Sequence, residues 1–293
     1  MIKVGPEVSL ENYPAVYDFF DEQTISGKIA NFAHNVFRIG YSPEVEYIGD
    51  AEQQIKEHFG EDGIAMLTST HGLLDDPFVL ASIAKREKVL RPLVKNTVIP
   101  AKEAIFNMAK NLPIVKNGVN KLMRVVLDNF IALPTFRDRD YPLEEMPEGE
   151  REQTEESLRG ANSRLIDRCV DSLDDEENLA IFPEGHRGDD PDEIQELKTG
   201  MIRMARRTKN QDRLFFIPVD IRYRHERKLR RKEGESKLAF TGRQISNLLK
   251  RRRPYVAIGE VVSIVSSDKE LLKLVKNGLQ ECVYRTKEME AAA

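Results

Sequence analysis

Short apolar segments alternate along this chain with longer segments whose apolar residues recur every three or four positions. The run Ile64–Thr68 follows Gly63, is mostly apolar and is too short for a helix, so it predicts a buried strand. In residues 150–173, by contrast, apolar residues such as Leu158 and Leu165 fall on one side of a helix. This alternation is typical of an α/β fold in which crossover connections make the sheet mostly parallel. We therefore expect a mixed, mostly parallel sheet flanked by helices.

The order of these segments predicts the organisation of the chain. Residues 10–40 carry a helical pattern, so we expect an N-terminal helical extension over residues 1–42. A main domain over residues 43–265 and a C-terminal helix over residues 266–293, packed on that domain, complete the prediction. The strands that we expect are Val45–Ile48, Ile64–Thr68, Val94–Ile99, Phe130–Leu133, Leu179–Phe182, Phe215–Arg222 and Tyr255–Ile258. The helices that we expect in the remainder are residues 51–59, 76–88, 101–110, 118–129, 150–173, 194–208 and 267–287.

Composition excludes several classes of protein. The two cysteines, Cys169 and Cys282, are too few for a disulfide scaffold, lie in no zinc-ligand spacing and fit a reducing compartment. The longest apolar runs are about six residues, whereas a transmembrane helix needs about 20. The first residues show no signal-peptide pattern. With a net charge of −4, nothing global suggests nucleic-acid binding, and we expect a cytoplasmic protein that does not cross a membrane.

The small net charge hides a division along the chain. Residues 138–197 hold 21 acidic and 6 basic residues, whereas residues 198–254 hold 19 basic and 5 acidic ones. One interpretation is a pair of solvated helical faces that partly neutralise each other. The other is a basic surface that faces anionic lipid or a phosphorylated ligand.

The pair His71 and Asp76 is the first candidate for chemistry. A histidine is the usual general base near neutral pH, and a carboxylate on its second ring nitrogen fixes the tautomer and stabilises the imidazolium. Positions five apart on one helix are separated by about 140°, so the pair can meet only if His71 lies on a turn and Asp76 at the entrance of a helix. The predicted strand, turn and helix supply this arrangement, with Asp75 as a competing partner. The alternative is that Asp76 only caps its helix and His71 is an ordinary turn residue.

Three further patterns follow or occupy predicted strands. The tight turn Pro183–Gly185, with Glu184 at its centre, offers backbone N–H groups that can face an anion. Arg137 and Arg139 come directly after a strand and suit bidentate binding of a phosphate. Pro218 lies inside a strand and implies a sheet edge or a bulge. Taken singly, the first pattern also fits a plain loop and the second also fits surface arginines.

The order of these patterns resembles the glycerolipid acyltransferase family, which includes 1-acylglycerol-3-phosphate acyltransferases, glycerol-3-phosphate acyltransferases and tafazzin. The matching segments, in order, are His71-x4-Asp76, an apolar strand that ends in Arg137, Phe182-Pro183-Glu184-Gly185, and the apolar-Pro-Val strand around Pro218. Further similar segments are Val45–Ile48, Leu197–Gly200 and Ile258–Val262. The resemblance covers residues 45–260 and implies that residues 43–265 form an acyltransferase domain.

The resemblance also implies roles for the residues of the first two patterns. His71 would be the general base, and Asp76 would orient it. The activated hydroxyl group of an acceptor would then attack the thioester of acyl-CoA or acyl carrier protein. Arg137, with Arg139 as a second candidate, would hold the phosphate of the acceptor.

The remaining matched residues receive roles in the same way. Thr70, Pro183, Glu184 and Gly185 would shape the acceptor site, and Pro218 would serve acyl-donor binding and structure. The family reaction uses no metal and no nucleotide. The sequence likewise has no cysteine and histidine cluster and no glycine-rich phosphate loop, so we expect no cofactor besides the acyl donor.

Three departures from the family pattern leave the acceptor open. Many members have Asn and Ser where this chain has Thr70 and Leu73, and His186 replaces a small or hydroxylated residue. We expect a lysophosphatidic-acid-like acceptor, with glycerol 3-phosphate, a lysophospholipid or a glycolipid head group as alternatives. A non-catalytic lipid-binding protein and a thioesterase that uses water are the alternatives outside this chemistry.

Two segments bear on how such a protein would meet lipid. The basic segment Arg222–Arg253 could contact anionic lipid, an acidic acyl carrier protein or the phosphates of CoA, or could be a solvated helix. Residues 10–40 carry an amphipathic pattern that could lie at a membrane interface or pack on the core. We expect a protein that is peripheral to the inner face of the membrane.

Overall fold

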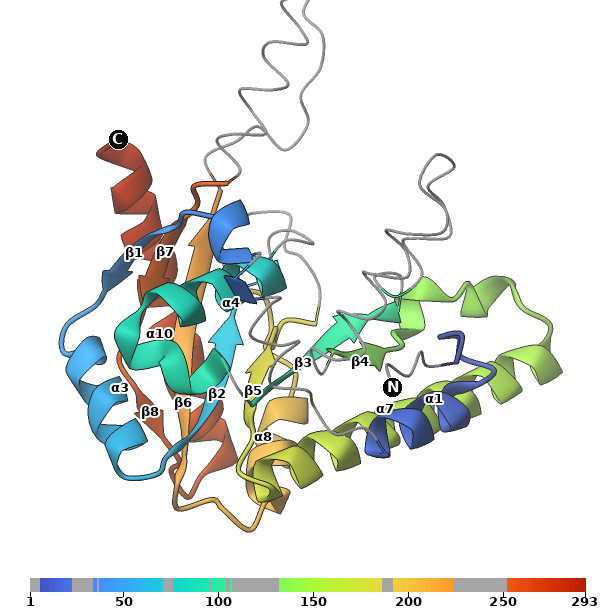
Figure 1. Ribbon diagram of the computed structural model, residues 1–293. Helices are drawn as coiled ribbons and strands as arrows, with labels where there is room; N and C mark the ends of the chain where they lie inside the picture. Colours follow the sequence, from blue (N-terminus) through green and yellow to red (C-terminus); the bar gives the residue numbers. More distant parts are fainter. Residues whose placement is uncertain are drawn as a thin grey trace, which may run out of the picture. The chain divides into compact units, whose positions relative to one another are not determined.

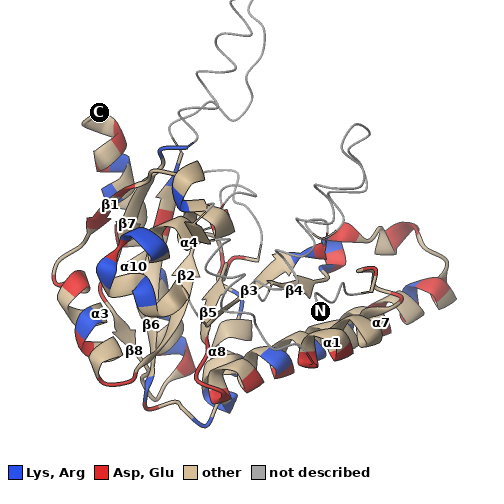
Figure 2. Ribbon diagram, in the orientation of Figure 1, with Lys and Arg blue, Asp and Glu red and all other residues tan. Residues whose placement is uncertain are grey.

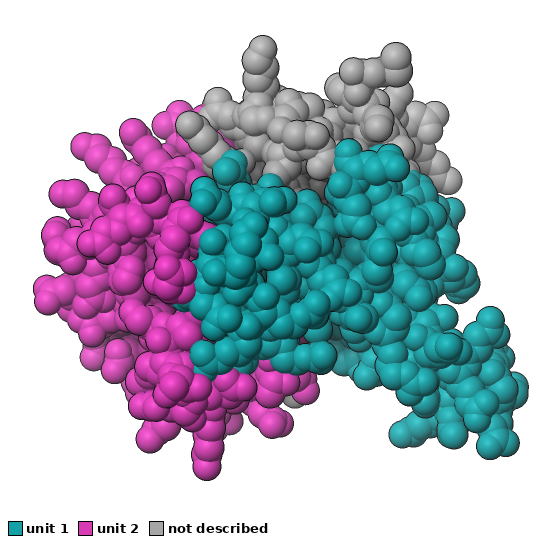
Figure 3. All heavy atoms as spheres, turned by 90° about the horizontal axis from the view of Figure 1, so that it is seen from below, with its two compact units in different colours: residues 1–33, 95–181, 200–211 teal, residues 34–94, 182–199, 212–293 magenta. Residues whose placement is uncertain are grey.

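In the computed structural model, strands and helices alternate along the chain as the sequence predicts (Figure 1). The described residues are 6–22, 34, 35, 37–70, 76–94, 96–103, 106, 132–185, 192–223 and 252–293. Two units, each built from segments distant in sequence, divide the chain (Figure 3). Unit 1 comprises residues 1–33, 95–181 and 200–211, and unit 2 comprises residues 34–94, 182–199 and 212–293. The domain boundaries at residues 42 and 265 stay a prediction.

Unit 2 is a mixed sheet covered by helices. Its strands are β1 (Glu44–Tyr47), β2 (Ile64–Ser69), β6 (Leu214–Arg222), β7 (Tyr255–Ile258) and β8 (Val262–Ser263). Its helices are α3 (Ala51–Gly60), α4 (Asp76–Arg86), α10 (Asp268–Ala291) and the 3₁₀ helix Lys88–Val94. The strands lie in the order β1-β7-β6-β2. The pairs β1–β7 and β2–β6 are parallel, whereas β7 and β8 both pair with β6 in the antiparallel direction.

Alternation along β6 places helices on both faces of this sheet. Phe215 stacks on His58 of α3, with the ring centroids 4.6 Å apart. Pro218, which is three positions further on and therefore points to the opposite face, packs against Gly278 of α10. The two helices thus cover opposite faces of β6. Helix α10 begins after Ser267, whose hydroxyl accepts the Glu270 N–H over 3.3 Å as a helix cap.

Unit 1 is a parallel sheet with one long helix against it. Its strands are β3 (Thr97–Lys102), β4 (Ala132–Thr135) and β5 (Asn178–Ile181), and β3 pairs in parallel with both of the others. Its helices are α1 (Tyr13–Asp21), α7 (Glu148–Asp174), α8 (Gly200–Arg207) and the 3₁₀ helices Asp138–Asp140 and Leu143–Glu145. Helix α7 contacts all three strands and packs against α1 and α8.

The helix α1 buries its apolar face within unit 1. Tyr17 is almost fully buried, and its hydroxyl donates to the carbonyl oxygen of Pro134 in β4 over 2.6 Å. Beside this face, Arg164 of α7 forms ion pairs with Asp18 and Asp21 at 2.5 and 2.9 Å. For residues 13–21, the structure therefore shows packing on the core.

The fold class is confirmed, and several boundaries need correction. β3 continues to Lys102, so the helix predicted from residue 101 does not begin there, and β4 ends at Thr135 and not at Leu133. β3 begins at Thr97 and not at Val94, because Lys88–Val94 forms a 3₁₀ helix that contains a proline. α8 begins at Gly200, and residues 194–199 are not helical. The predicted helix over residues 118–129, and most of the one over residues 101–110, lie outside the described residues.

Figure 2 marks the positions of the acidic residues along the ribbon. They are concentrated on the first half of α7 and on the two short helices before it. Most of the basic segment, residues 224–251, lies outside the described part of the chain. None of the helices in the described part combines the length and the apolar character that crossing a bilayer requires.

Candidate active site

Asp76 lies in the first turn of α4, at the end of the predicted catalytic turn (residues 70–76). Its side chain is 0% exposed, and the hydroxyl of Tyr223 donates to Asp76 Oδ1 over 2.8 Å. A buried carboxylate needs such partners, and the N-terminal end of a helix favours negative charge. His71 and Asp75 lie outside the described residues. The strand and the helix on either side of the turn are confirmed, and the contact between His71 and Asp76 stays a prediction.

Thr70 continues the pairing of β2 with β6 and holds a buried carboxylate. Its N–H donates to the Val219 carbonyl oxygen over 3.1 Å, and its hydroxyl donates to Asp220 Oδ1. The second oxygen of that carboxylate accepts the hydroxyl of Thr286 in α10. Asp220 is 3% exposed, and this burial raises the pKa of its carboxyl. The two hydroxyl groups and the Arg222 guanidinium act in the opposite direction, and the nearby Asp76 carboxylate adds to the effect of burial.

The tight turn after β5 is present as predicted. The Gly185 N–H donates to the Phe182 carbonyl oxygen over 2.9 Å, and Gly185 has a φ of +68°, which only glycine adopts readily. The Pro183 carbonyl oxygen accepts the Lys198 N–H over 2.7 Å. Because the Gly185 N–H is used inside the turn, it is not one of the groups that could face an anion.

Glu184 points inward from this turn. It is 3% exposed, and its Oε1 accepts the Gln195 N–H over 2.7 Å. The contact ties the turn to the segment that follows it ten residues later. A role of Glu184 in shaping the acceptor site stays a prediction, and His186 lies outside the described residues.

Arg137 and Arg139 belong to unit 1, and only Arg137 forms a fork-like ion pair. Its Nε and Nη2 donate to Asp140 Oδ2 and Oδ1 over 2.8 and 3.0 Å, and Lys102 donates to the same carboxylate over 2.8 Å. Burial acts to raise the pKa of Asp140, but the hydrogen bonds from Arg137 and Lys102 outweigh it and hold the pKa below its usual value. Arg139 is exposed. The two guanidinium nitrogens of Arg137 that could bind a phosphate are therefore bonded to Asp140 in this structure.

Pro218 does not lie on an edge strand, so of the two expected alternatives the edge is wrong. The register supports the bulge, because residues 217 and 218 of β6 lie opposite the three residues 259–261. Within unit 2, β6 has β2 on one side and both β7 and β8 on the other. The Pro218 carbonyl oxygen accepts the Gly259 N–H over 2.9 Å, so the missing N–H of this proline faces the same side. There it lies between Phe216, which pairs with β8, and Val219, which pairs with β7. Because the ladder changes partner at this point, the missing donor breaks no strand pairing.

The structure brings Thr70 and Asp76 together with residues that the sequence did not single out. Asp220 lies near the end of β6 and Tyr223 directly after it. The parallel pairing of β6 with β2 places both at the end of the sheet where Thr70 lies. A signal was available for Asp220, since it is the sole charged residue in the run Leu214–Ile221. Thr286, a hydroxyl-bearing residue on an amphipathic helix, gave no comparable signal.

A metal site finds no support among the described residues. Within them, no three His, Cys, Asp or Glu side chains are placed to hold a metal ion. Cys169 and Cys282 are both buried free thiols, and burial raises the pKa of each.

Comparisons with known proteins agree with the family resemblance. The Acyltransferase family model matches residues 50–222, a range that includes Thr70, Asp76, Arg137, Glu184 and Pro218. Among solved structures, the chain is similar to the 1-acyl-sn-glycerophosphate (LPA) acyltransferase PlsC from Thermotoga maritima. The identity is 15%, the TM-score is 0.44, and the match covers 94% of this chain and 82% of that chain. No curated protein matches the sequence.

Proposed function

Since this chain belongs to the acyltransferase family, we propose that it transfers a fatty acyl group from the thioester of acyl-CoA or acyl carrier protein to a hydroxyl group of a lysophosphatidic-acid-like acceptor. One observation carries the proposal. A fully buried carboxylate, Asp76, stands at the start of α4, inside the matched region and five residues after His71. The strand β2 comes before the turn and the helix α4 after it, which is the order of elements that a His-x4-Asp pair requires.

His71 acts as the general base in this reaction. It takes the proton from the acceptor hydroxyl while that oxygen attacks the carbonyl carbon of the thioester. The carbon–sulfur bond then breaks, and the proton passes from His71 to the departing thiolate, so that no cofactor is consumed. Asp76 orients the imidazole and stabilises its charged form, and the 2.8 Å bond from Tyr223 fixes the carboxylate.

The acceptor is held by residues of two other patterns and by Thr70. Arg137 exchanges the Asp140 carboxylate for the phosphate of the acceptor, since both groups suit the same planar fork. Arg139 is a second phosphate ligand. Thr70 and the turn Pro183–Gly185, including Glu184, shape the remainder of the acceptor site.

The acyl donor and the membrane involve two further regions. Pro218 supports the donor site from its place inside β6, where Gly259 and Gly278 approach it. The excess of basic residues between positions 198 and 254 favours contact with anionic lipid, carrier protein or CoA phosphates. The protein then works from the cytoplasm, peripheral to the inner face of the membrane.

The experiment measures thiol release from palmitoyl-CoA by the purified protein, and separately from an acyl carrier protein thioester. Each donor is tested alone and with lysophosphatidic acid, glycerol 3-phosphate or a neutral lysolipid. We expect release that requires one of the phosphate-bearing acceptors. His71→Ala and Asp76→Asn should lower kcat about 10²-fold or more, since removal of general base catalysis costs that much. Asp174→Asn is the matched control, because Asp174 accepts a threonine hydroxyl in unit 1 and lies in none of the matched patterns.

The outcomes separate the alternatives. Release without acceptor identifies a thioesterase. Turnover that survives both His71→Ala and Asp76→Asn rules out the proposed base. An absence of release with both donors and every acceptor refutes the proposal and leaves a lipid-binding protein.

A further inference from the structure

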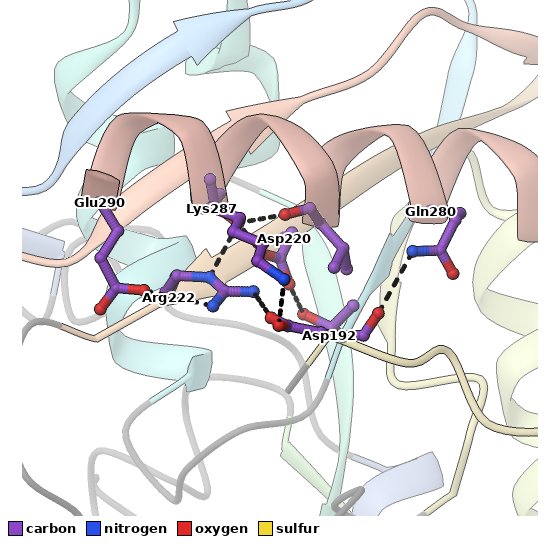
Figure 4. Close-up of polar contacts among 9 residues, drawn as sticks. Asp192, Asp220, Arg222, Gln280, Lys287 and Glu290 are labelled. Carbon is purple, nitrogen blue, oxygen red and sulfur yellow. Dashed lines mark hydrogen bonds and ion pairs between the residues drawn. The ribbon is translucent and has the colours of Figure 1, made fainter. Parts of the chain in front are cut away.

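A chain of polar contacts crosses the otherwise apolar interface between β6 and α10 (Figure 4). Asp220 lies at its centre and accepts the hydroxyls of Thr70 and Thr286 on its two oxygens. Arg222, two positions further along β6, donates from Nε to Thr286 Oγ1 over 3.4 Å and from Nη1 to Glu290 over 3.2 Å. The end of β2, the strand β6 and the C-terminal helix are therefore joined through one set of side chains.

Ion pairs fix α10 at the same place. Asp192 accepts Arg222 Nη2 and Lys287 Nζ, each over 2.5 Å, and its carbonyl oxygen accepts Gln280 Nε2 over 3.4 Å (Figure 4). The side chain of Arg222 is only 10% exposed, so solvent screens this pair weakly. The hydrogen bonds from Lys287 and Arg222 also lower the pKa of Asp192. Helix α10 is thus tied to β6 and to the segment that follows the turn Pro183–Gly185.

Strand register explains why Asp220 can reach both neighbours. Thr68 pairs with Pro218 and Ser69 with Val219, so Thr70 comes level with Asp220. Pro218 and Asp220 point to the same face of β6, and this is the face that α10 covers. Asp220 therefore lies between Thr70 and α10, and Thr70 is the residue directly before His71.

Stability alone gives little reason for a carboxylate here. Of the residues of β6 on the same face, Pro218 is apolar and Arg222 is already paired with Asp192 and Glu290, and the buried residues of α10 are mostly apolar. A buried carboxyl group costs free energy even when it is hydrogen-bonded, and an apolar side chain at such a position is often as stable or more stable. Hydrogen bonds are directional, however. The bonds from Thr70 and Thr286 to the two oxygen atoms of Asp220 fix the positions of these side chains more closely than apolar packing does.

We propose that Asp220 is a positioning residue through which α10 fixes Thr70 and, with it, the start of the catalytic turn. The inference rests on the proposed function, because it takes His71 as the base of an acyl transfer. The inference gives the C-terminal helix a part in the acyltransferase site. The contact is made by Thr286, which is 66 residues from Asp220 in the sequence. Loss of the link should misplace the base and lower the rate of the chemical step more than the binding of the acyl donor.

The test removes one hydroxyl at the far end of the link. Thr286→Val keeps the shape of the side chain but cannot donate to Asp220, whereas Thr286→Ser retains the donor. We expect Thr286→Val to lower kcat about tenfold or more while the KM for the acyl donor changes less than about twofold, and Thr286→Ser to keep most of the activity. Thr208→Val is the matched control, because Thr208 is equally buried and donates to the Asp174 carboxylate over 2.6 Å in unit 1. We expect this control to leave kcat unchanged.

Hydrogen exchange of residues 64–70 provides a readout that needs no turnover. Thr286→Val should speed exchange of these amides, and Thr208→Val should not. Should Thr286→Val fail to fold, Asp220→Asn removes the charge while it keeps the size of the side chain, and it should show the same two effects.

The two readouts keep the failures apart. If the wild-type protein transfers no acyl group, the proposed function fails, and the exchange result still decides whether α10 fixes Thr70. A Thr286→Val variant with wild-type kcat overturns the inference. So does one that loses activity with unchanged exchange at residues 64–70, or one in which only KM changes.

Discussion

Replacement of Gly278 by alanine tests how closely α10 must approach β6. A Cβ atom at this position would lie 2.7 Å from Pro218 Cγ and 3.3 Å from Pro218 Cβ. The first distance is about 0.7 Å short of the 3.4 Å at which ordinary contact begins. Pro218 cannot rotate away, because its ring is closed on the backbone of a strand that is paired on both sides. The helix must therefore move outward or the strand must shift.

The expected cost follows from two opposing effects. Overpacking of a close contact costs about 1–3 kcal/mol, whereas alanine is better than glycine in a helix by about 1 kcal/mol. Since neither side of the contact is a flexible side chain, we expect the cost to lie in the upper part of its range. Gly278→Ala should therefore lower the free energy of unfolding by about 1–2 kcal/mol.

Urea unfolding measures this difference, with equal m-values for the two proteins as the condition for comparing them. Gly149→Ala in α7 is the control, because a Cβ at Gly149 meets nothing within 4 Å. It should leave stability unchanged or raise it by up to about 1 kcal/mol. A Gly278→Ala protein as stable as the wild type would refute the close packing of α10 on Pro218.

Three further predictions concern charges and the turn. Burial raises the pKa of Asp220 in the folded protein, so ionisation of this group opposes folding increasingly as the pH rises above about 4, the value for an unfolded carboxyl group. The free energy of unfolding of Asp220→Asn, relative to wild type in urea titrations, should therefore rise between pH 4 and 7, and a constant difference would contradict the raised pKa. Asp140→Asn removes the competitor for Arg137 and should lower the KM for a phosphate-bearing acceptor by up to about fivefold, since pairs of this exposure contribute about 0–1 kcal/mol. A KM above the wild-type value would argue against Arg137 as the phosphate ligand. Gly185→Ala should destabilise the protein by roughly 1–2 kcal/mol, and the cause should be the positive φ alone, because the new Cβ would have room at 3.5 Å from Lys198 Cγ. Gly185→Asn should cost less. Equal losses of stability for the two variants would point to a steric cause.

Local sequence patterns determined the elements of this protein and the family to which it belongs. Strand and helix periodicities depend on residues a few positions apart, so β2, α4, α7 and α10 appear close to their predicted bounds. The position of Asp76 at a helix start and the positive φ of Gly185 are equally local properties. Even the pairing of Arg137 is local, but it needed the 3₁₀ turn that brings Asp140, and not Asp138, back to the guanidinium.

Only the tertiary structure decided which distant groups meet at the site. Asp220 accepts hydroxyls from Thr70 and Thr286, which are 150 and 66 positions away, and no periodicity in the sequence reports such pairs. The interior position of Pro218 depended in the same way on β7 and β8 sharing one side of β6. The physical reason is that these contacts are set by strand register and by the close approach of α10. Strand register and helix packing both depend on residues far apart in the sequence, so neither can be determined from a local sequence pattern.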